Sequence, residues 1–113
     1  MLFGWEISME RLYRYYNGTL SEKDTVSGIY KVYLDILTVA KDKREAKKRY
    51  KECLIRNSIP LEVLKFDPGI CELVGAEEMM NDHFTEEMKA ELANNNSVLY
   101  HVDRKVLNRI LSV

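Results

Sequence analysis

The sequence predicts an all-α protein, a compact irregular bundle of five or six short-to-medium helices in one domain spanning residues 1–113. Apolar residues recur three and four positions apart over most of the chain, which is typical of amphipathic helices. Several of these stretches also follow a residue that favours a helix N-terminus. The chain of 113 residues has the length of one domain, and 46% of its residues are hydrophobic. A core without disulfides or metal is therefore expected.

The first two helices are expected over 5–16 and 22–40. Asn17-Gly18 provides a stop after the first, and Ser21–Asp24 resembles a capping box before the second. An extended start over 2–7 is the alternative for the first, because Phe3, Trp5 and Ile7 alternate. The second helix has an apolar stripe at helical spacing: Ile29, Val32, Tyr33, Ile36, Leu37 and Ala40.

A third helix is expected over the basic segment 41–57. Its apolar side is rotated by roughly 85° from that of the preceding stripe, at about 100° per residue. A break or kink is therefore predicted near Lys41–Lys43. The residue before Pro60 leaves the helical region of backbone space and ends this helix.

Shorter helices are expected in the second half of the chain. Pro60 opens one over 60–64, and Asp67-Pro68-Gly69 forms a turn before another helix over 70–84. Thr85 caps a helix that ends at Asn94–Asn96, and Asp103 caps a last helix over 104–112. With Asp103 as the cap, 98–102 is extended or forms a separate turn. Short strands at 2–7, 60–66 and 98–102 are the main alternative to the all-α prediction.

Charge is unevenly distributed along the chain. Residues 41–56 carry eight basic and three acidic side chains, a net charge of +5, whereas 67–91 carry eight acidic and one basic, a net charge of −7. The candidate basic patch comprises Lys41, Arg44, Lys47, Lys48 and Lys51. The candidate acidic patch comprises Glu77, Glu78, Asp82, Glu86 and Glu87. These segments can pair within the fold, pair between copies, or face a partner.

Signatures of catalysis and of cofactor binding are missing from the sequence. The five glycines are isolated, so no phosphate-binding loop is expected. Neither His83 nor His101 lies in a metal-binding motif, and neither Cys53 nor Cys71 has a nucleophile signature. No apolar run approaches about 18 residues, and acidic and basic residues interrupt the N-terminal stretch. We therefore expect no enzyme activity, cofactor, metal or membrane span, and a cytoplasmic location with reduced thiols.

Nucleic-acid binding is the alternative function. The basic helix could lie along phosphates, and Tyr13, Tyr15, Tyr16, Tyr30 and Tyr33, with Arg11 and Arg14 among them, could stack bases. Residues 102–111 also resemble the second helix of a helix-turn-helix, although Asn94–Asn96 departs from the pattern. The DNA-reading residues would then be Arg104, Lys105, Asn108 and Arg109.

The leading prediction is a non-enzymatic intracellular module that binds another protein, with homo-oligomerisation left open. Its small size and the missing catalytic motifs suggest a regulator or inhibitor of a larger complex, of the kind that phages and mobile elements carry. Whether the acidic region covers the basic helix decides between an architectural and a functional role for the charge.

Overall fold

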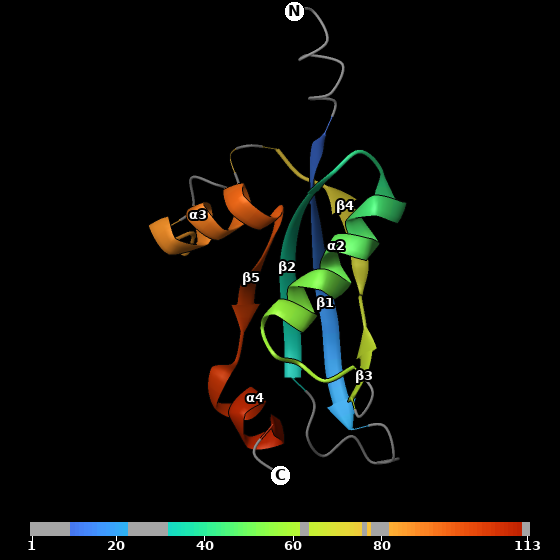
Figure 1. Ribbon diagram of the computed structural model, residues 1–113, viewed down its shortest axis with the longest axis vertical. Helices are drawn as coiled ribbons and strands as arrows, with labels where there is room; N and C mark the ends of the chain where they lie inside the picture. The colour runs from blue at the N-terminus through green and yellow to red at the C-terminus, as the bar shows by residue number, and fades with distance from the viewer. Residues whose placement is uncertain (1–9, 23–31, 62–63, 76, 78–81, 112–113) are drawn as a thin grey trace, which may run out of the picture.

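The computed structural model describes residues 10–22, 32–61, 64–75, 77 and 82–111 (Figure 1). In these residues the chain forms a five-stranded antiparallel sheet and three helices, so the all-α prediction is wrong. In chain order the elements are β1 (Arg11–Glu22), β2 (Val32–Ala40), α2 (Lys43–Arg56), β3 (Leu64–Asp67), β4 (Ile70–Leu73), α3 (Glu86–Asn95), β5 (Ser97–Val102) and α4 (Arg104–Leu111).

Strands β1 and β2 form the middle of the sheet. β5 pairs with the free side of β2, while β3 and β4 both pair with β1. β3 and β4 share one register along β1, from Glu22 opposite Leu64 to Tyr13 opposite Leu73. They therefore act as a single edge strand with an interruption.

The interruption is the predicted turn at Asp67-Pro68-Gly69, although the chain does not reverse there. The Gly69 amide donates to Asp67 Oδ1 at 2.9 Å, and Gly69 has a φ of 76°. Proline is tolerated because this strand lies at the sheet edge, where a missing N–H breaks no ladder. The break also protects the edge from pairing with another chain.

The two predicted N-terminal helices are strands in the described residues, for a physical reason. Leu34 and Ile36 are buried in one cluster of the core, while Leu37, on the opposite face of β2, is buried in another. A strand covered on both faces has adjacent apolar pairs, and these reproduce the spacing of a helical stripe. Residues 1–9, with the alternative extended start, and 23–31, with most of the capping box, lie outside the described residues.

The predicted basic helix is confirmed as α2. Asp42 caps it, with its Oδ1 accepting from the Glu45 amide at 2.8 Å. The side facing the sheet buries Ala46, Tyr50, Cys53 and Leu54. At the predicted break near Lys41–Lys43, β2 has ended and α2 begins.

In the second half of the chain, the helices predicted over 60–64 and 70–84 are wrong, because β3 and β4 occupy part of both ranges. The alternative strands at 60–66 and 98–102 correspond to β3 and β5. The two predicted caps are confirmed. Thr85 Oγ1 accepts from the Met88 amide at 3.2 Å, and Asp103 Oδ1 accepts from the Lys105 and Val106 amides.

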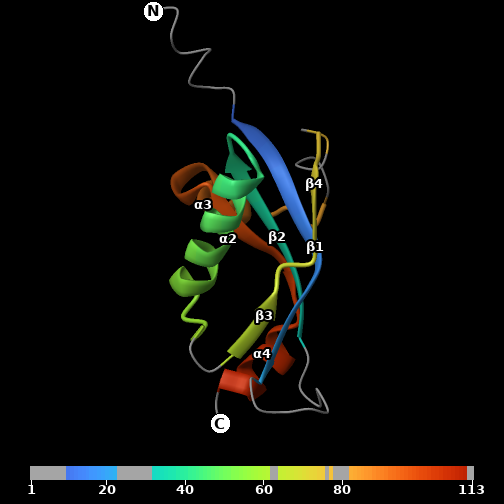
Figure 2. The same cartoon turned by 90° about the vertical axis from the view of Figure 1, so that its right-hand side faces the viewer.

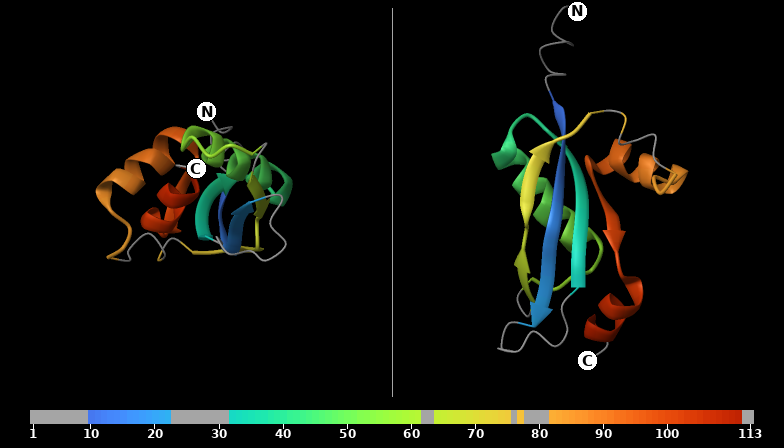
Figure 3. Two further views of the ribbon diagram at one scale, coloured as in Figure 1. Left: turned by 90° about the horizontal axis from the view of Figure 1, so that it is seen from below. Right: turned by 180° about the vertical axis from the view of Figure 1, so that it is seen from behind.

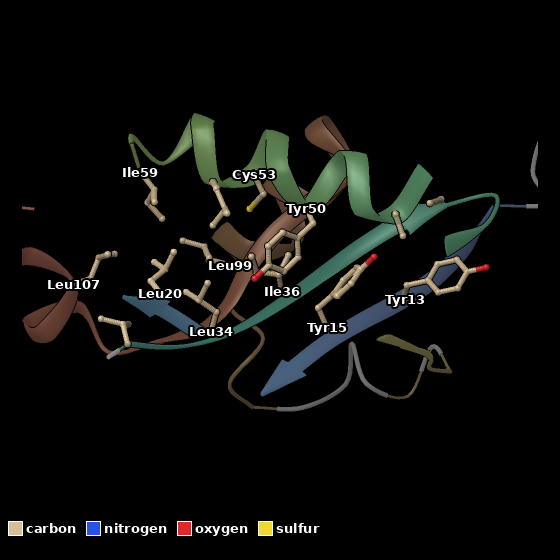
Figure 4. Close-up of a cluster of buried hydrophobic side chains, with 14 residues drawn as sticks. Tyr13, Tyr15, Leu20, Leu34, Ile36, Tyr50, Cys53, Ile59, Leu99 and Leu107 are labelled. Carbon is tan, nitrogen blue, oxygen red and sulfur yellow. The ribbon is translucent and has the colours of Figure 1, made fainter. Parts of the chain in front are cut away.

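The core consists of two clusters of buried side chains. The larger lies between α2 and the sheet, and includes the residues labelled in Figure 4. The smaller joins Leu37, Val98 and Tyr100 of the sheet to Phe84 and Leu92 beside α3. In the view that shows the sheet close to edge-on, α2 lies along one of its two sides (Figure 2).

Candidate interaction surfaces

The candidate basic patch is exposed on α2 and just before its first residue, and we call it the basic face: Lys41, Arg44, Lys47, Lys48 and Lys51. Arg44, Lys47, Lys48 and Lys51 lie three or four residues apart, so they share one side of the helix. This side points away from the sheet, because Ala46, Tyr50, Cys53 and Leu54 occupy the opposite one. The packing of the helix thus determines that these cations face solvent.

The basic face is not neutralised by the rest of the described chain. None of its five cations forms an ion pair with a described residue, although the Lys51 ammonium lies over the Phe66 ring at 5.9 Å. Other cations of α2 do form pairs. Arg49 bonds to Glu10 at 3.3 Å and Glu45 at 3.4 Å, and Arg56 to Glu91 at 3.0 Å.

The described part of the acidic segment therefore does not neutralise the basic face. Arg56–Glu91 is the one ion pair that joins the two segments among the described residues. Four of the candidate acidic residues are exposed, namely Glu77, Asp82, Glu86 and Glu87; Glu78 lies outside the described residues. Glu86 pairs only locally, with Lys89 at 3.2 Å.

In the view from behind, no described helix crosses β4, β1 or β2 on the sheet face opposite α2 (Figure 3, right), although Leu37 of β2 is buried on that face in the smaller cluster. A cleft of about 560 Å³ lies on this side, which we call the tyrosine cleft. Arg14 and Tyr16 come from β1, Tyr33 and Asp35 from β2, and His101 from β5. The start of α4 adds Asp103 and Val106 to its wall.

An ion pair fixes the floor of the tyrosine cleft. Arg14 Nη2 lies 2.6 Å from Asp35 Oδ2, and Arg14 Nε lies 3.0 Å from Asp35 Oδ1, which is a bidentate arrangement. The guanidinium also lies over the rings of Tyr16 and Tyr100, at 5.9 and 5.5 Å. Contacts of this kind hold the arginine in one orientation.

The described tyrosines of the group noted in the sequence lie on both sides of the sheet. Tyr13 and Tyr15 are buried on the side facing α2, and Tyr30 lies outside the described residues. Tyr33 is 65% exposed, and Tyr16 is half-buried with its hydroxyl 3.3 Å from Glu72 Oε2. Desolvation, followed by the Glu72 carboxylate, raises the pKa of Tyr16.

The cleft could not be found under a helical interpretation of the sequence. Arg14 and Asp35 are 21 positions apart and meet only because β1 and β2 pair. The usable signal was the alternation in Arg14-x-Tyr16 and Tyr33-x-Asp35, which places each pair on one face of a strand.

The candidate DNA-reading residues of α4 are exposed: Arg104, Lys105, Asn108 and Arg109. Leu107, on the other side of the helix, is buried against the main core. A strand, β5, separates α4 from α3, so these two helices do not form a helix-turn-helix. The exposed cations of α4 remain next to the wall of the tyrosine cleft that Asp103 and Val106 form.

The two histidines and the buried cysteine are the remaining residues that could carry chemistry. His83 and His101 are brought together, with ring centroids 5.5 Å apart. However, no group of three or more His, Cys, Asp or Glu residues suited to a metal occurs in the described part of the chain. Burial raises the pKa of the Cys53 thiol to about 11, so it is an inert core thiol at neutral pH.

The fold and its surfaces define a small α+β protein with a helix on one sheet face and two unlike exposed surfaces. No family model, curated protein or solved structure matches this chain. None of the helices in the described residues is both long and apolar enough to span a bilayer.

Proposed function

We propose that this protein is a non-enzymatic binding module whose basic face docks on an acidic surface of another protein. The observation that carries the proposal is the exposure of five cations, four on one side of α2 and Lys41 just before it, with no ion pair to the described chain. Complementary charge accelerates encounter and selects the partner. Docking without chemistry is sufficient for a small regulator or inhibitor of a larger complex. The two free cysteines favour action in the reducing cytoplasm.

The charge balance favours a protein partner over a long nucleic acid. The whole chain has a net charge of −1 and a pI of about 6.1, whereas nucleic-acid-binding domains are commonly strongly basic. The stripe from Arg44 to Lys51 extends along the helix for only about 10 Å, at 1.5 Å per residue. A long polyanion would continue past it towards the acidic region. A compact acidic patch on a protein can match the basic face in size and end where the basic face ends.

The test is a charge reversal on the basic face, Arg44→Glu with Lys48→Glu. The wild type, used as bait in a lysate at about 50 mM salt, should retain another protein in stoichiometric amount. The reversed variant should lose this partner. The matched control is Arg104→Glu with Lys105→Glu on α4, which changes the charge equally and should retain the partner. Binding should also weaken steeply at about 500 mM salt, because screening shortens the range of charge attraction.

Two outcomes would contradict the proposal. One is a partner that the reversed variant retains as well as the wild type. The other is binding that nuclease treatment removes, or direct affinity for duplex DNA that falls steeply with salt and disappears in the reversed variant. The second result would assign the basic face to nucleic acid, which is the alternative function.

The reversed variant should fold normally. Arg44 and Lys48 are exposed and lack ion pairs in the described chain, so we expect the free energy of unfolding to change by no more than about 0.5 kcal/mol. Urea unfolding monitored by circular dichroism measures this change. A larger loss would mean that these cations stabilise the fold itself.

A further inference from the structure

We propose that the tyrosine cleft binds single-stranded nucleic acid, with bases stacking on Tyr16 and Tyr33. This site lies on the opposite side of the sheet from the basic face and goes beyond the function proposed above. Three properties of the cleft point to this ligand: the rings of exposed Tyr33 and half-buried Tyr16, a fixed guanidinium beside Tyr16, and cations at one border.

The aromatic rings of Tyr33 and Tyr16 are the first property. Tyr33 lies on β2, a central strand, and yet 65% of its surface is exposed. Tyr16 lies on the neighbouring strand and lines the same cleft. From the register and the strand spacing, the two residues are about 10 Å apart, which two or three nucleotides can span. Every base has a flat face, so such rings stack bases without regard to sequence.

The Arg14–Asp35 pair is the second property. Asp35 is only 8% exposed, and its carboxylate holds Arg14 through three hydrogen bonds of 2.6 to 3.2 Å. The guanidinium contacts the Tyr16 ring and presents its own planar surface beside it. Because this arrangement is already formed, a base can stack there without first ordering the side chains. Asn17, His101 and Asp103 border the cleft and can hydrogen-bond to base edges.

The charge around the cleft is the third property. Arg104 and Lys105 are exposed at the start of α4, next to Asp103 and Val106 of the cleft wall. These cations can neutralise phosphates of a strand whose bases enter the cleft. Glu72 and Asp103 equal these two cations in number, so stacking contributes more of the affinity than phosphate contacts do. A duplex hides the base faces and is therefore a poorer ligand.

Fluorescence anisotropy with labelled 12-nucleotide single strands of RNA and DNA, at about 50 mM salt, tests the inference. Tyr33→Ala and Tyr16→Ala should each weaken binding by about 5-fold to 100-fold, the range for loss of one base stack. Tyr33→Phe and Tyr16→Phe keep the ring and should retain binding. The Arg44→Glu, Lys48→Glu variant should also retain it, since those residues lie on the other side of the sheet. Tyr33→Ala should in turn retain the protein partner of the basic face, so the two proposals fail independently.

Several outcomes would overturn the assignment. They are no measurable binding to any single strand, equal affinity for a duplex of the same length, or unchanged affinity in Tyr33→Ala. Loss of binding in the α2 reversal alone would place the nucleic acid on the basic face instead. A captured protein that depends on Tyr33, without affinity for single strands, would make the cleft a protein-docking site. Tyr33 is exposed, so its alanine variant should fold, and circular dichroism verifies this.

Discussion

Tyr50 shows how one residue can be well packed and still carry an electrostatic cost. Its ring lies 4.8 Å from that of Tyr15 and 5.9 Å from that of Phe66, at the centre of the main cluster (Figure 4). Its hydroxyl is buried and has no hydrogen-bond partner among the described residues. Burial also raises its pKa. An unpaired buried hydroxyl costs about 1–3 kcal/mol, whereas the ring contributes through packing.

Tyr50→Phe should therefore leave stability unchanged or raise it by up to about 1 kcal/mol, because it removes the hydroxyl and keeps the ring. Tyr50→Ala should cost about 3–5 kcal/mol through loss of the ring. Urea unfolding of the two variants measures both effects. A loss above about 1 kcal/mol in the phenylalanine variant would show that the hydroxyl has a partner.

The buried thiol of Cys53 should make the protein less stable at alkaline pH. Burial raises the pKa of its thiol from 9.0 to about 11 in the folded protein. Between these values the folded chain retains a proton that the unfolded chain releases, so stability falls as pH rises. The urea midpoint should be constant up to about pH 8.5, and the Cys53 thiol should account for roughly 2 kcal/mol of the stability lost by pH 11.

The Cys53→Ala variant should be less stable at neutral pH, but its stability should fall less steeply between pH 9 and 10. Above pH 10 the tyrosines Tyr15 and Tyr50 steepen the decline in every variant, because burial raises their pKa as well. A Cys53→Ala profile parallel to that of the wild type would exclude this origin.

At the scale of elements, local signals predicted helix ends better than strand identity. The caps at Thr85 and Asp103 lie where the sequence predicts them, because a cap is a contact within three residues, whereas the cap at Asp42 was found only in the structure. The strands could not be identified in this way. The burial of Ile36 and Leu37 on opposite faces depends on α2, α3 and neighbouring strands, which are distant in sequence.

Asp42→Ala should destabilise the protein by about 0.5–2 kcal/mol, because the Glu45 amide loses its side-chain acceptor. Asp42→Asn retains an acceptor and should recover most of the loss. Thermal unfolding of the two variants gives the comparison. Equal losses in alanine and asparagine would indicate that the negative charge at the helix N-terminus, rather than the hydrogen bond, is responsible.

At the scale of the whole molecule, stability should be concentrated in the centre of the sheet. β1 and β2 are paired on both sides, and α2 covers one of their faces. By contrast, α3 buries only Leu92 of its described residues. Regions with few buried side chains open at lower free energy than the core does.

Native-state hydrogen exchange should therefore find the slowest amides in β1 and β2, and faster exchange in α3. The expected difference in opening free energy is about 1–3 kcal/mol. NMR measurements at several urea concentrations would resolve it. Equal protection of α3 and β2 would mean that the two clusters open as one unit.

Local sequence patterns were enough to predict α2, the caps at Thr85 and Asp103 and the uneven distribution of charge, because these depend on neighbours within a few residues. Long-range contacts were needed to establish that 11–22 and 32–40 are strands and that no cation of the basic face pairs with a described acidic residue. They also brought Arg14, Tyr16, Tyr33 and Asp35 into one cleft. The reason is that strand pairing and burial on two faces join residues that are far apart in sequence, and the hydrophobic pattern of one strand does not record its partners.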